Sequence, residues 1–230
     1  MNNKKVSIII PARNEESFIK TTIEKYRSQD YPAEIVVVVN NSKDRTYEIA
    51  KNIADKVLNF QDDIGVSAAR NEGAKVATGD VFVFSDADCY LEQGTVRKIA
   101  DKVSSNTIGS PLGRGDSNTF KSKAFFFFRN LIHRLKIYQG VVGGIIICSK
   151  DVFVRAGGFD QNKRIAEFFD FIKRAKENGA EYKLFTDCYG VASMRRYEEQ
   201  GYLKPVIFWI EWKILSIFKK EKKLTEEYFK

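Results

Sequence analysis

The stretch VFVFSDAD, residues 81–88, joins an apolar run of strand-forming residues to two carboxylates, Asp86 and Asp88. Side chains at positions i and i+2 of an extended segment point to the same side, so both carboxylates are expected to face one ligand just beyond a strand. Mg²⁺ and Mn²⁺ prefer oxygen ligands and suit sites with few carboxylates, in which water and phosphate oxygens complete the shell. The stretch therefore predicts a divalent-cation site. The alternative is that one Asp caps a helix beginning near Glu92 and the other is solvated.

Short runs rich in Val, Ile and Phe alternate with helical patterns through the N-terminal half of the chain. Pro11 is expected to stop the first strand, and Asp44 is expected to cap the second helix. This alternation predicts an α/β fold with a mostly parallel central sheet and helices on both faces. The expected strands cover residues 6–10, 34–39, 56–60 and 81–85, and the expected helices cover residues 14–29, 44–56 and 66–77.

Polar residues follow each of these expected strands. Ligands of parallel sheets bind beyond the carboxyl ends of the strands, where the strand order reverses, so these residues predict one site. The sequence has neither G-x-G-x-x-G after the first strand nor G-x-x-x-x-G-K-[ST], so a common dinucleotide-binding fingerprint and a P-loop are unsupported. The polar clusters are residues 12–15, 40–42, 62–63 and 86–88.

The pattern loosens after Gly109. Residues 109–119 are rich in Gly, Ser and Asn and are expected to form a loop, and a basic aromatic segment follows. Residues 141–148 have the pattern of a strand, and residues near 165–178 have that of a helix. We expect these elements to complete the site on the same sheet.

Four ordered motifs resemble family 2 of the glycosyltransferases, the inverting sugar-nucleotide enzymes with the GT-A fold. The resemblance covers roughly residues 5 to 180. The chain length predicts one domain, expected over residues 1–203 with a nucleotide-binding half (1–105) and an acceptor half (106–203), and the C-terminal pattern predicts an amphipathic helical tail over 204–230. The motifs are VSIIIPARNEE (6–16), EIVVVVNNSKDRT (34–46), GVSAARNEGAKVATGDVFVFSDAD (65–88) and VGGIIICSKDVFVRAGGFD (142–160).

The resemblance also implies a donor site over the strand ends. The first loop would line the base and ribose, Asn40 would face the base, Arg70 would lie near the diphosphate, and Mg²⁺ or Mn²⁺ would bridge the phosphates. An R-R-[FY] run late in the chain would reach the diphosphate, unless it is a solvated basic pair. The donor-binding residues implied are Pro11, Ala12, Arg13, Glu15, Asn40, Arg70, Asp86, Ala87, Asp88, Arg195 and Arg196, of which Asp86 and Asp88 would hold the metal.

Two of these residues have structural alternatives. Arg70 would serve as scaffold if it paired with Asp63 or Asp86, and Glu15 would be an ordinary helix-start acid favoured by the helix dipole.

The sequence departs from the family pattern at two positions. Asn40 replaces a usual carboxylate; an amide oxygen still accepts a hydrogen bond but carries no charge, which weakly favours UDP-sugars over GDP-sugars. Phe168 stands where the family places the Asp that serves as general base. Glu167 and Asp170 are the remaining candidates, since positions three apart share a helix face. A third possibility is an acceptor that is already an anion, such as a lipid phosphate, which needs no base.

The formal net charge is +8, and residues 121–150 contain six Lys or Arg and no acid. A basic stripe favours nucleic acid, anionic lipid or the phosphates of a sugar nucleotide, or it is simply a solvated surface. No nucleic-acid-binding module is recognisable, so nucleic acid is the least favoured partner. Three distant cysteines, Cys89, Cys148 and Cys188, suggest reduced thiols in a cytoplasmic protein rather than a disulfide framework or a zinc site.

No uncharged apolar run reaches 18 residues, so a spanning helix is not expected. Two aromatic and basic segments, 125–138 and 206–218, suit the surface of an anionic membrane. For the first, packing on the sheet is an equally good interpretation. For the second, contact with the inner face of the membrane is favoured.

The sequence therefore predicts a metal-dependent, inverting glycosyltransferase that moves a sugar from a nucleotide-diphosphate sugar to a glycan or polyprenyl-linked acceptor. A nucleotidylyltransferase is an alternative, but it usually needs a Gly-rich loop after the first strand, which PARNEE lacks. A second alternative is a protein that binds a sugar nucleotide or a membrane without turnover.

Overall fold

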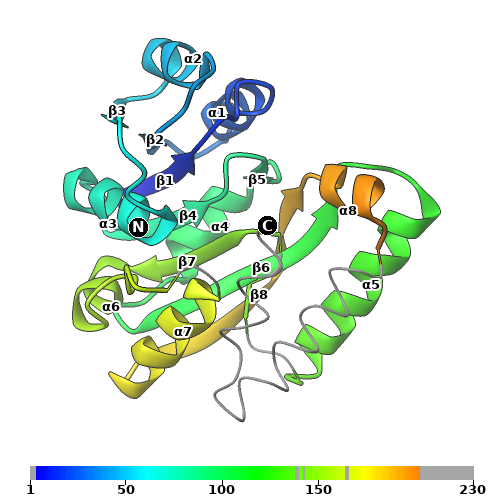
Figure 1. Cartoon of the computed structure of the whole chain (residues 1–230). Helices are drawn as coiled ribbons and strands as arrows, with labels where there is room; N and C mark the ends of the chain where they lie inside the picture. Colours follow the sequence, from blue (N-terminus) through cyan, green and yellow to red (C-terminus); the bar gives the residue numbers. More distant parts are fainter. Residues whose placement is uncertain (1–3, 138–139, 142, 164–165, 203–230) are drawn as a thin grey trace.

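A computed structural model describes residues 4–202, apart from 138–139, 142 and 164–165. The expected α/β architecture is confirmed: helices cover both faces of one eight-stranded sheet with the order β3-β2-β1-β4-β7-β6-β8-β5 (Figure 1). The predicted tail, residues 204–230, lies outside the described residues. The strands are β1 (Val6–Ala12), β2 (Ala33–Asn40), β3 (Lys56–Phe60), β4 (Val81–Ser85), β5 (Cys89–Leu91), β6 (Thr107–Gly115), β7 (Ile145–Ser149) and β8 (Glu181–Ala192). The helices are α1 (Ile19–Arg27), α2 (Thr46–Ile53), α3 (Val66–Val76), α4 (Thr95–Lys102), α5 (Phe120–Arg134), α6 (Lys150–Arg155), α7 (Glu167–Glu177) and α8 (Arg195–Gln200).

The N-terminal half forms the parallel part of the sheet. Strands β3, β2, β1 and β4 pair in parallel, so their carboxyl ends meet at one edge. β1 continues through Pro11, which the sequence analysis expected to stop it, and still pairs with β2 as far as Ala12. The first helix begins at Ile19 instead of residue 14, because Asn14 has a left-handed backbone (φ 54°). Asp44 accepts hydrogen bonds from Thr46 at the start of α2, as an N-terminal cap would, although the helix itself begins two residues later.

The C-terminal half extends the sheet with both parallel and antiparallel pairs. β7 pairs antiparallel with β4 and β6, whereas β6 runs parallel to β8. The prediction of a loop over residues 109–119 was wrong for its first part, because β6 runs to Gly115. Small residues permit this close pairing: a Cβ on Gly109 would lie 1.9 Å from the Lys183 carbonyl oxygen of β8. Composition suggested a turn, but close strand contact explains the glycine.

Alternating residues of the central strands feed two cores, one on each face. Ile8 and Ile10 of β1 pack with α1 and α4 in one cluster, while Ile9 packs with α3, α6 and α7 in the other. β4 follows the same period, with Phe82 and Phe84 on the second face. Because both faces of β1 and β4 are buried, the polar groups at their carboxyl ends are held on a rigid frame.

Helix α5 lies along the side of β6 and β8, with α8 at its N-terminal end (Figure 1). Among the described residues, no helix combines the length and apolar character needed to cross a bilayer.

Candidate functional site

The loop after β4 carries Asp86, Ala87 and Asp88 and is braced from three directions. Thr22 Oγ1 of α1 donates a hydrogen bond to the Ala87 carbonyl oxygen (2.7 Å), and the backbone N–H of Ser193, after β8, donates to the Asp88 carbonyl oxygen (3.2 Å). The Asp86 N–H donates to the Gly144 carbonyl oxygen, just before β7. Elements from both halves of the chain therefore fix the two carboxylates.

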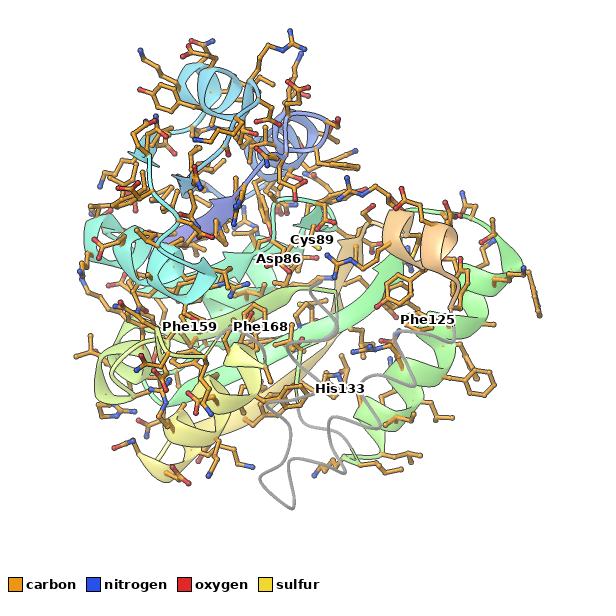
Figure 2. The ribbon with its side chains drawn as sticks, in the orientation of Figure 1. Asp86, Cys89, Phe125, His133, Phe159 and Phe168 are labelled. Atoms are coloured by element: carbon orange, nitrogen blue, oxygen red, sulfur yellow. The ribbon has the colours of Figure 1, made fainter. Side chains whose placement is uncertain are left out.

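This loop leads into a strand. The alternative in which one Asp caps a helix near Glu92 was wrong, because β5 begins at Cys89 and α4 begins only at Thr95. Figure 2 shows Asp86 and Cys89 together at this edge of the sheet.

Gly144 allows a close approach to the carboxylate of Asp86. A Cβ on this glycine would lie 2.5 Å from Asp86 Oδ2, and its φ of +64° is one that other residues rarely adopt. The second glycine of the motif VGGIII is thus explained by the room that Asp86 needs.

Arg70 joins the loop after β4 to helix α7. Its Nη2 donates to Asp86 Oδ1 (2.7 Å) and its Nη1 donates to Glu167 Oε1 (2.9 Å). The Arg70 side chain is 2% exposed and that of Glu167 is 15% exposed. Of the two partners that the sequence left open for Arg70, the structure shows Asp86. Asp63 pairs with Arg13 instead. The charge of Arg70 is held by two carboxylates, one from each half of the chain.

Phe168 covers this ion-pair network. Its ring centre lies 4.1 Å from the guanidinium carbon of Arg70, and the ring of Phe159 lies 5.4 Å from the same atom. Figure 2 shows the two phenylalanines side by side, in an edge-to-face arrangement with centroids 5.8 Å apart. A cation near an aromatic face is attracted by the ring quadrupole. The residue found at the expected position of the base thus serves to cover Arg70.

Asn71, next to Arg70 on α3, holds the turn of the G-G-F-D motif. Its Nδ2 donates to the Phe159 carbonyl oxygen (2.8 Å), and its Oδ1 accepts from the Phe159 N–H (2.9 Å). The motifs A-R-N and G-G-F-D are therefore partners in space, and together they tie the two halves of the chain.

The structure does not bring Asp170 into this network. Its Oδ2 accepts a hydrogen bond from Nε of Arg174 (2.8 Å), one turn along the same helix. Glu167 and Asp170 start on the same helical turn, yet only Glu167 reaches the residues at the strand ends.

Asn40 holds the loop between β3 and α3. Its Oδ1 accepts from the Ile64 N–H (2.9 Å), and its Nδ2 donates to Asp63 Oδ1 (2.9 Å). The other Asp63 oxygen accepts from Arg13 Nη1 (2.6 Å). The Gly65 N–H beside Asp63 lowers the pKa of that carboxyl, against a smaller rise from burial, and Asn40 and Arg13 lower it further. Asn40 replaces the carboxylate that the family usually has at this position, and the carboxylate of Asp63, hydrogen-bonded to Asn40, supplies a negative charge beside it.

Glu15 faces the loop after β4 from the end of β1. Burial raises its pKa to about 7; Asp88 adds to the rise, and Arg195 opposes it. Within the described chain, its Oε2 is buried without a hydrogen-bond partner. A buried carboxyl oxygen in this state can accept a hydrogen bond from a ligand hydroxyl or N–H, and the ligand-binding role of Glu15 stays a prediction.

Arg195 and Arg196 begin α8, and both are exposed. The guanidinium of Arg195 lies 4.5 Å from the ring centre of Phe18, which follows the first loop. Arg195 therefore lies beside the first loop, and its reach to a diphosphate stays a prediction. No comparable contact ties Arg196 to the site among the described residues.

The carboxylates at this edge fit a hard cation. Loss of hydration raises the pKa of Asp86 to about 6 despite Arg70, and the charges of Asp88 and Glu167 add to the rise. A cation would relieve this repulsion. The described residues contain no cluster of three or more His, Cys, Asp or Glu suited to a metal; among them, Asp86 and Asp88 would be the pair of oxygen ligands. Such a pair suits Mg²⁺ or Mn²⁺, which take the remaining ligands from water and phosphate.

Sequence reasoning missed Cys89 and Phe18, and it placed Asp63 in a polar cluster without giving it a role. Cys89 donates its thiol hydrogen to Asp88 Oδ1 (3.2 Å), and burial raises the pKa of the thiol well above its ordinary value, so it stays protonated. Asp63 carries the charge that position 40 lacks, and Phe18 meets Arg195. The polar cluster at 62–63 was a signal for Asp63; Cys89 and Phe18 gave none, because their roles depend on packing.

The sequence model described as Glycosyl transferase family 2 matches residues 7–198. The chain belongs to this family. It is 33% identical over 145 residues to the dolichol-phosphate mannosyltransferase of Pyrococcus furiosus, covering 59% of this chain and 40% of that protein. The chain thus spans less than half the length of this relative.

Solved structures show the same GT-A fold. A mannosyltransferase from Pyrobaculum calidifontis, in complex with GDP-Man and Mn²⁺, matches with a TM-score of 0.68 and 21% identity, over 82% of this chain and 56% of that one. TarS of S. aureus (residues 1–349), in complex with UDP, matches with a TM-score of 0.63 and 20% identity, over 85% and 62% of the two chains. The family 2 assignment and the fold therefore agree, while the roles of individual site residues stay predictions.

Proposed function

We propose that this family 2 protein is a metal-dependent, inverting glycosyltransferase that takes its sugar from a nucleotide-diphosphate sugar. The observation that carries the proposal is the convergence of Glu15, Asp86 and Asp88 at the carboxyl edge of the parallel strands, where open α/β sheets bind their ligands. Residues 1–105 would form the nucleotide-binding half and residues 106–203 the acceptor half. Arg70, which spans the two halves, would keep their site residues in register.

Asp88, together with Asp86, would hold Mg²⁺ or Mn²⁺ against the diphosphate. A cation bound there would neutralise the charge that develops on the leaving diphosphate. Support comes from the clustered carboxylates and from the Mn²⁺ named with the P. calidifontis enzyme. Pro11, Ala12, Arg13 and Ala87 would line the nucleotide beside them.

In the proposed reaction an acceptor oxygen attacks the anomeric carbon, and the diphosphate leaves from the opposite face, which inverts that carbon. Glu167 is the candidate to take the acceptor proton, because its described contacts engage Oε1 only. Its Oε1 is engaged with Arg70, and the residue beside it is Phe168 instead of a second acid. An acceptor that arrives as an anion, such as a polyprenyl phosphate, would need no base and is therefore favoured over a neutral glycan hydroxyl.

The base of the donor is proposed to be uracil. Asn40 Oδ1 keeps one lone pair after accepting from Ile64, which suits the single N–H of uracil better than the two adjacent donors of guanine. The two structural relatives carry UDP in one case and GDP-Man in the other, so both bases belong in the test.

Polyprenyl-linked acceptors are proposed because the P. furiosus relative is named for dolichol phosphate. A cytoplasmic protein that contacts the inner face of a membrane would meet such acceptors. The segment 204–230, predicted to contribute that contact, lies outside the described residues.

The experiment is calorimetric titration with UDP- and GDP-sugars in the presence of Mn²⁺, followed by measurement of sugar release or transfer. The proposal expects metal-dependent binding with turnover, and tighter binding of UDP-sugars. Binding without release or transfer to any acceptor would favour the alternative of a sugar-nucleotide-binding protein. Pyrophosphate release from a nucleoside triphosphate and a sugar phosphate would favour a nucleotidylyltransferase.

A further inference from the structure

Helix α5 buries few of its residues and leaves most of its large apolar side chains exposed. Ser122, Phe126 and His133 are buried against the sheet, where His133 Nε2 and the Tyr182 hydroxyl of β8 lie 2.8 Å apart. Figure 2 shows His133 and Phe125 on the side of α5 nearer to the rest of the molecule. At 3.6 residues per turn, positions 120, 127, 128, 131 and 135 lie on the opposite side.

That opposite side is exposed. Of the eight large apolar side chains that are exposed in the described part of the chain, seven lie between residues 120 and 137, and the eighth is Val154 on α6. Phe120 is 86% exposed and Phe127 is 63% exposed. Large apolar patches on one surface mark sites of interaction, whereas single exposed residues need no explanation. We call this set the α5 surface: Phe120, Phe127, Phe128, Leu131, Ile132, Leu135 and Ile137.

Cations accompany the α5 surface, and acids do not. Lys121, Lys123, Arg134 and Lys136 are exposed among or beside its apolar residues. The sequence has no Asp or Glu between Asp116 and Asp151. A partner that fits must therefore accept aromatic and aliphatic side chains while presenting negative charge around them.

The length of α5 determines its orientation at a membrane. Its 15 residues extend about 22 Å at 1.5 Å per residue, less than the roughly 30 Å of a hydrocarbon core. A helix with an apolar side and flanking cations, too short to span, lies in the plane of the membrane interface.

A hollow beside α5 adjoins the same surface. A cavity of about 410 Å³ lies between α5 and β6; Lys123 and Phe127 line it, together with Arg114 of β6 and Tyr189 of β8. Apolar and cationic groups thus continue from the surface of the helix to the sheet, a combination that suits a lipid headgroup with its first acyl carbons.

Helix α8 connects the α5 surface with the candidate donor site. The ring of Phe125 on α5 lies 4.8 Å from that of Tyr197 on α8, and Arg195 at the start of α8 meets Phe18 beside the first loop. Only α8 separates the α5 surface from the candidate donor site, so a membrane bound by α5 would lie close to that site.

We propose that α5 docks this protein onto a membrane surface rich in anionic lipid, with its apolar residues in the interface and its cations on the headgroups. The inference extends beyond the proposed transfer reaction and does not depend on it. Docking brings a lipid-borne acceptor within reach of the site, and it replaces the water that now faces the phenylalanines.

The test is flotation of the full chain with vesicles of phosphatidylcholine, either alone or mixed in equal parts with phosphatidylglycerol. We expect binding to the mixed vesicles and little binding to phosphatidylcholine alone. Reversing Lys121, Lys123 and Arg134 to Glu should lower the partition coefficient on the order of 100-fold or more, since each cation near the surface contributes about 1 kcal/mol. Replacing Phe127, Phe128 and Leu131 by Ser should lower it at least about tenfold.

Matched controls keep the test specific. Val154→Ser removes the exposed apolar residue outside α5, and Lys20→Glu, Lys51→Glu and Lys173→Glu together reverse three exposed cations elsewhere; both should bind like the wild type. Donor hydrolysis should be unchanged in the Phe127, Phe128 and Leu131 variant without vesicles, which separates docking from chemistry.

Several results would overturn the proposal. The first is that the wild type binds neither vesicle, and the second is that it binds both vesicles equally. The third is that the α5 variants bind as the wild type does, and this result would place binding in residues 203–230. Wild-type dimers in sedimentation that the Ser variant converts to monomers, without a change in vesicle binding, would assign the surface to a second copy of the chain.

Discussion

The guanidinium carbon of Arg70 lies 4.1 Å from the ring centre of Phe168. The same guanidinium donates hydrogen bonds to the carboxylates of Asp86, after β4, and Glu167, on α7. Phe168 therefore shields a buried ion-pair network that joins α3, the loop after β4 and α7. Water competes poorly with charges in such a setting, so each partner depends on the others.

Arg70→Ala should destabilise the protein by about 3 kcal/mol, because it leaves the largely buried Glu167 (15% exposed) without its partner, while the partly hydrated Asp86 (39% exposed) contributes less. Urea unfolding measures this change. Arg97→Ala is the matched control: its pair with Asp30 is exposed, so its loss should cost about 1 kcal/mol or less. Equal costs for the two variants would show that the Arg70 network does not hold the halves together.

Glu167→Gln and Asp170→Asn separate the two candidate bases on one helix. If a neutral hydroxyl is the acceptor, Glu167→Gln should lower kcat by about 10²–10⁴-fold, whereas Asp170→Asn should have little effect, since Asp170 is paired with Arg174. With a lipid phosphate as acceptor, neither variant should lose the proton-transfer contribution. Steady-state kinetics with both acceptor types gives the answer; a large loss confined to Asp170→Asn would contradict the assignment.

Glu34 should make stability fall in acid. Burial raises its pKa, but hydrogen bonds from Lys56, Ser7 and the Thr78 N–H outweigh that effect and lower the pKa from 4.5 to about 2. Since the folded pKa lies below the unfolded one, the stabilisation is fully present above about pH 4.5 and is lost as the pH falls toward 2. Over this window Glu34→Gln should flatten the fall in the free energy of unfolding by at most about 3 kcal/mol. A variant with the wild-type acid slope would exclude Glu34 as its source.

The four parallel strands of the N-terminal half could be predicted to within about two residues because local patterns decide them, whereas the helix ends could not: α1 covers Ile19–Arg27 instead of 14–29. The strand expected at 56–60 is β3, and the strand expected at 81–85 is β4, since runs of β-branched and aromatic residues have few alternatives between two helices. The loop expected at 109–119 was wrong for its first part because Gly109 allows a close approach between β6 and β8, which composition does not distinguish from a turn. β5 is three residues long and exists only by pairing with β8.

The site divides in the same way. The convergence of Asp86, Asp88 and Glu15 could be predicted because strand ends in a parallel sheet meet at one edge. The pairing of Arg70 with Glu167 could not be predicted, because the two residues are 97 positions apart in the sequence and local patterns carry no information on such contacts. The role of Phe168 could not be predicted either. In the sequence, a Phe that packs on Arg70 cannot be distinguished from a Phe that simply replaces a catalytic Asp, because the contact with Arg70 depends on the fold.

The central claim is that Asp88 serves a metal-dependent donor site. The most direct measurement is the rate of sugar release from the preferred nucleotide sugar, with and without Mn²⁺, for the wild type, Asp88→Asn and the control Asp101→Asn, an exposed residue of α4. The account predicts that turnover needs Mn²⁺, that Asp88→Asn lowers it by about 100-fold or more, and that Asp101→Asn matches the wild type. Mn²⁺-dependent turnover at the wild-type rate in Asp88→Asn would contradict it.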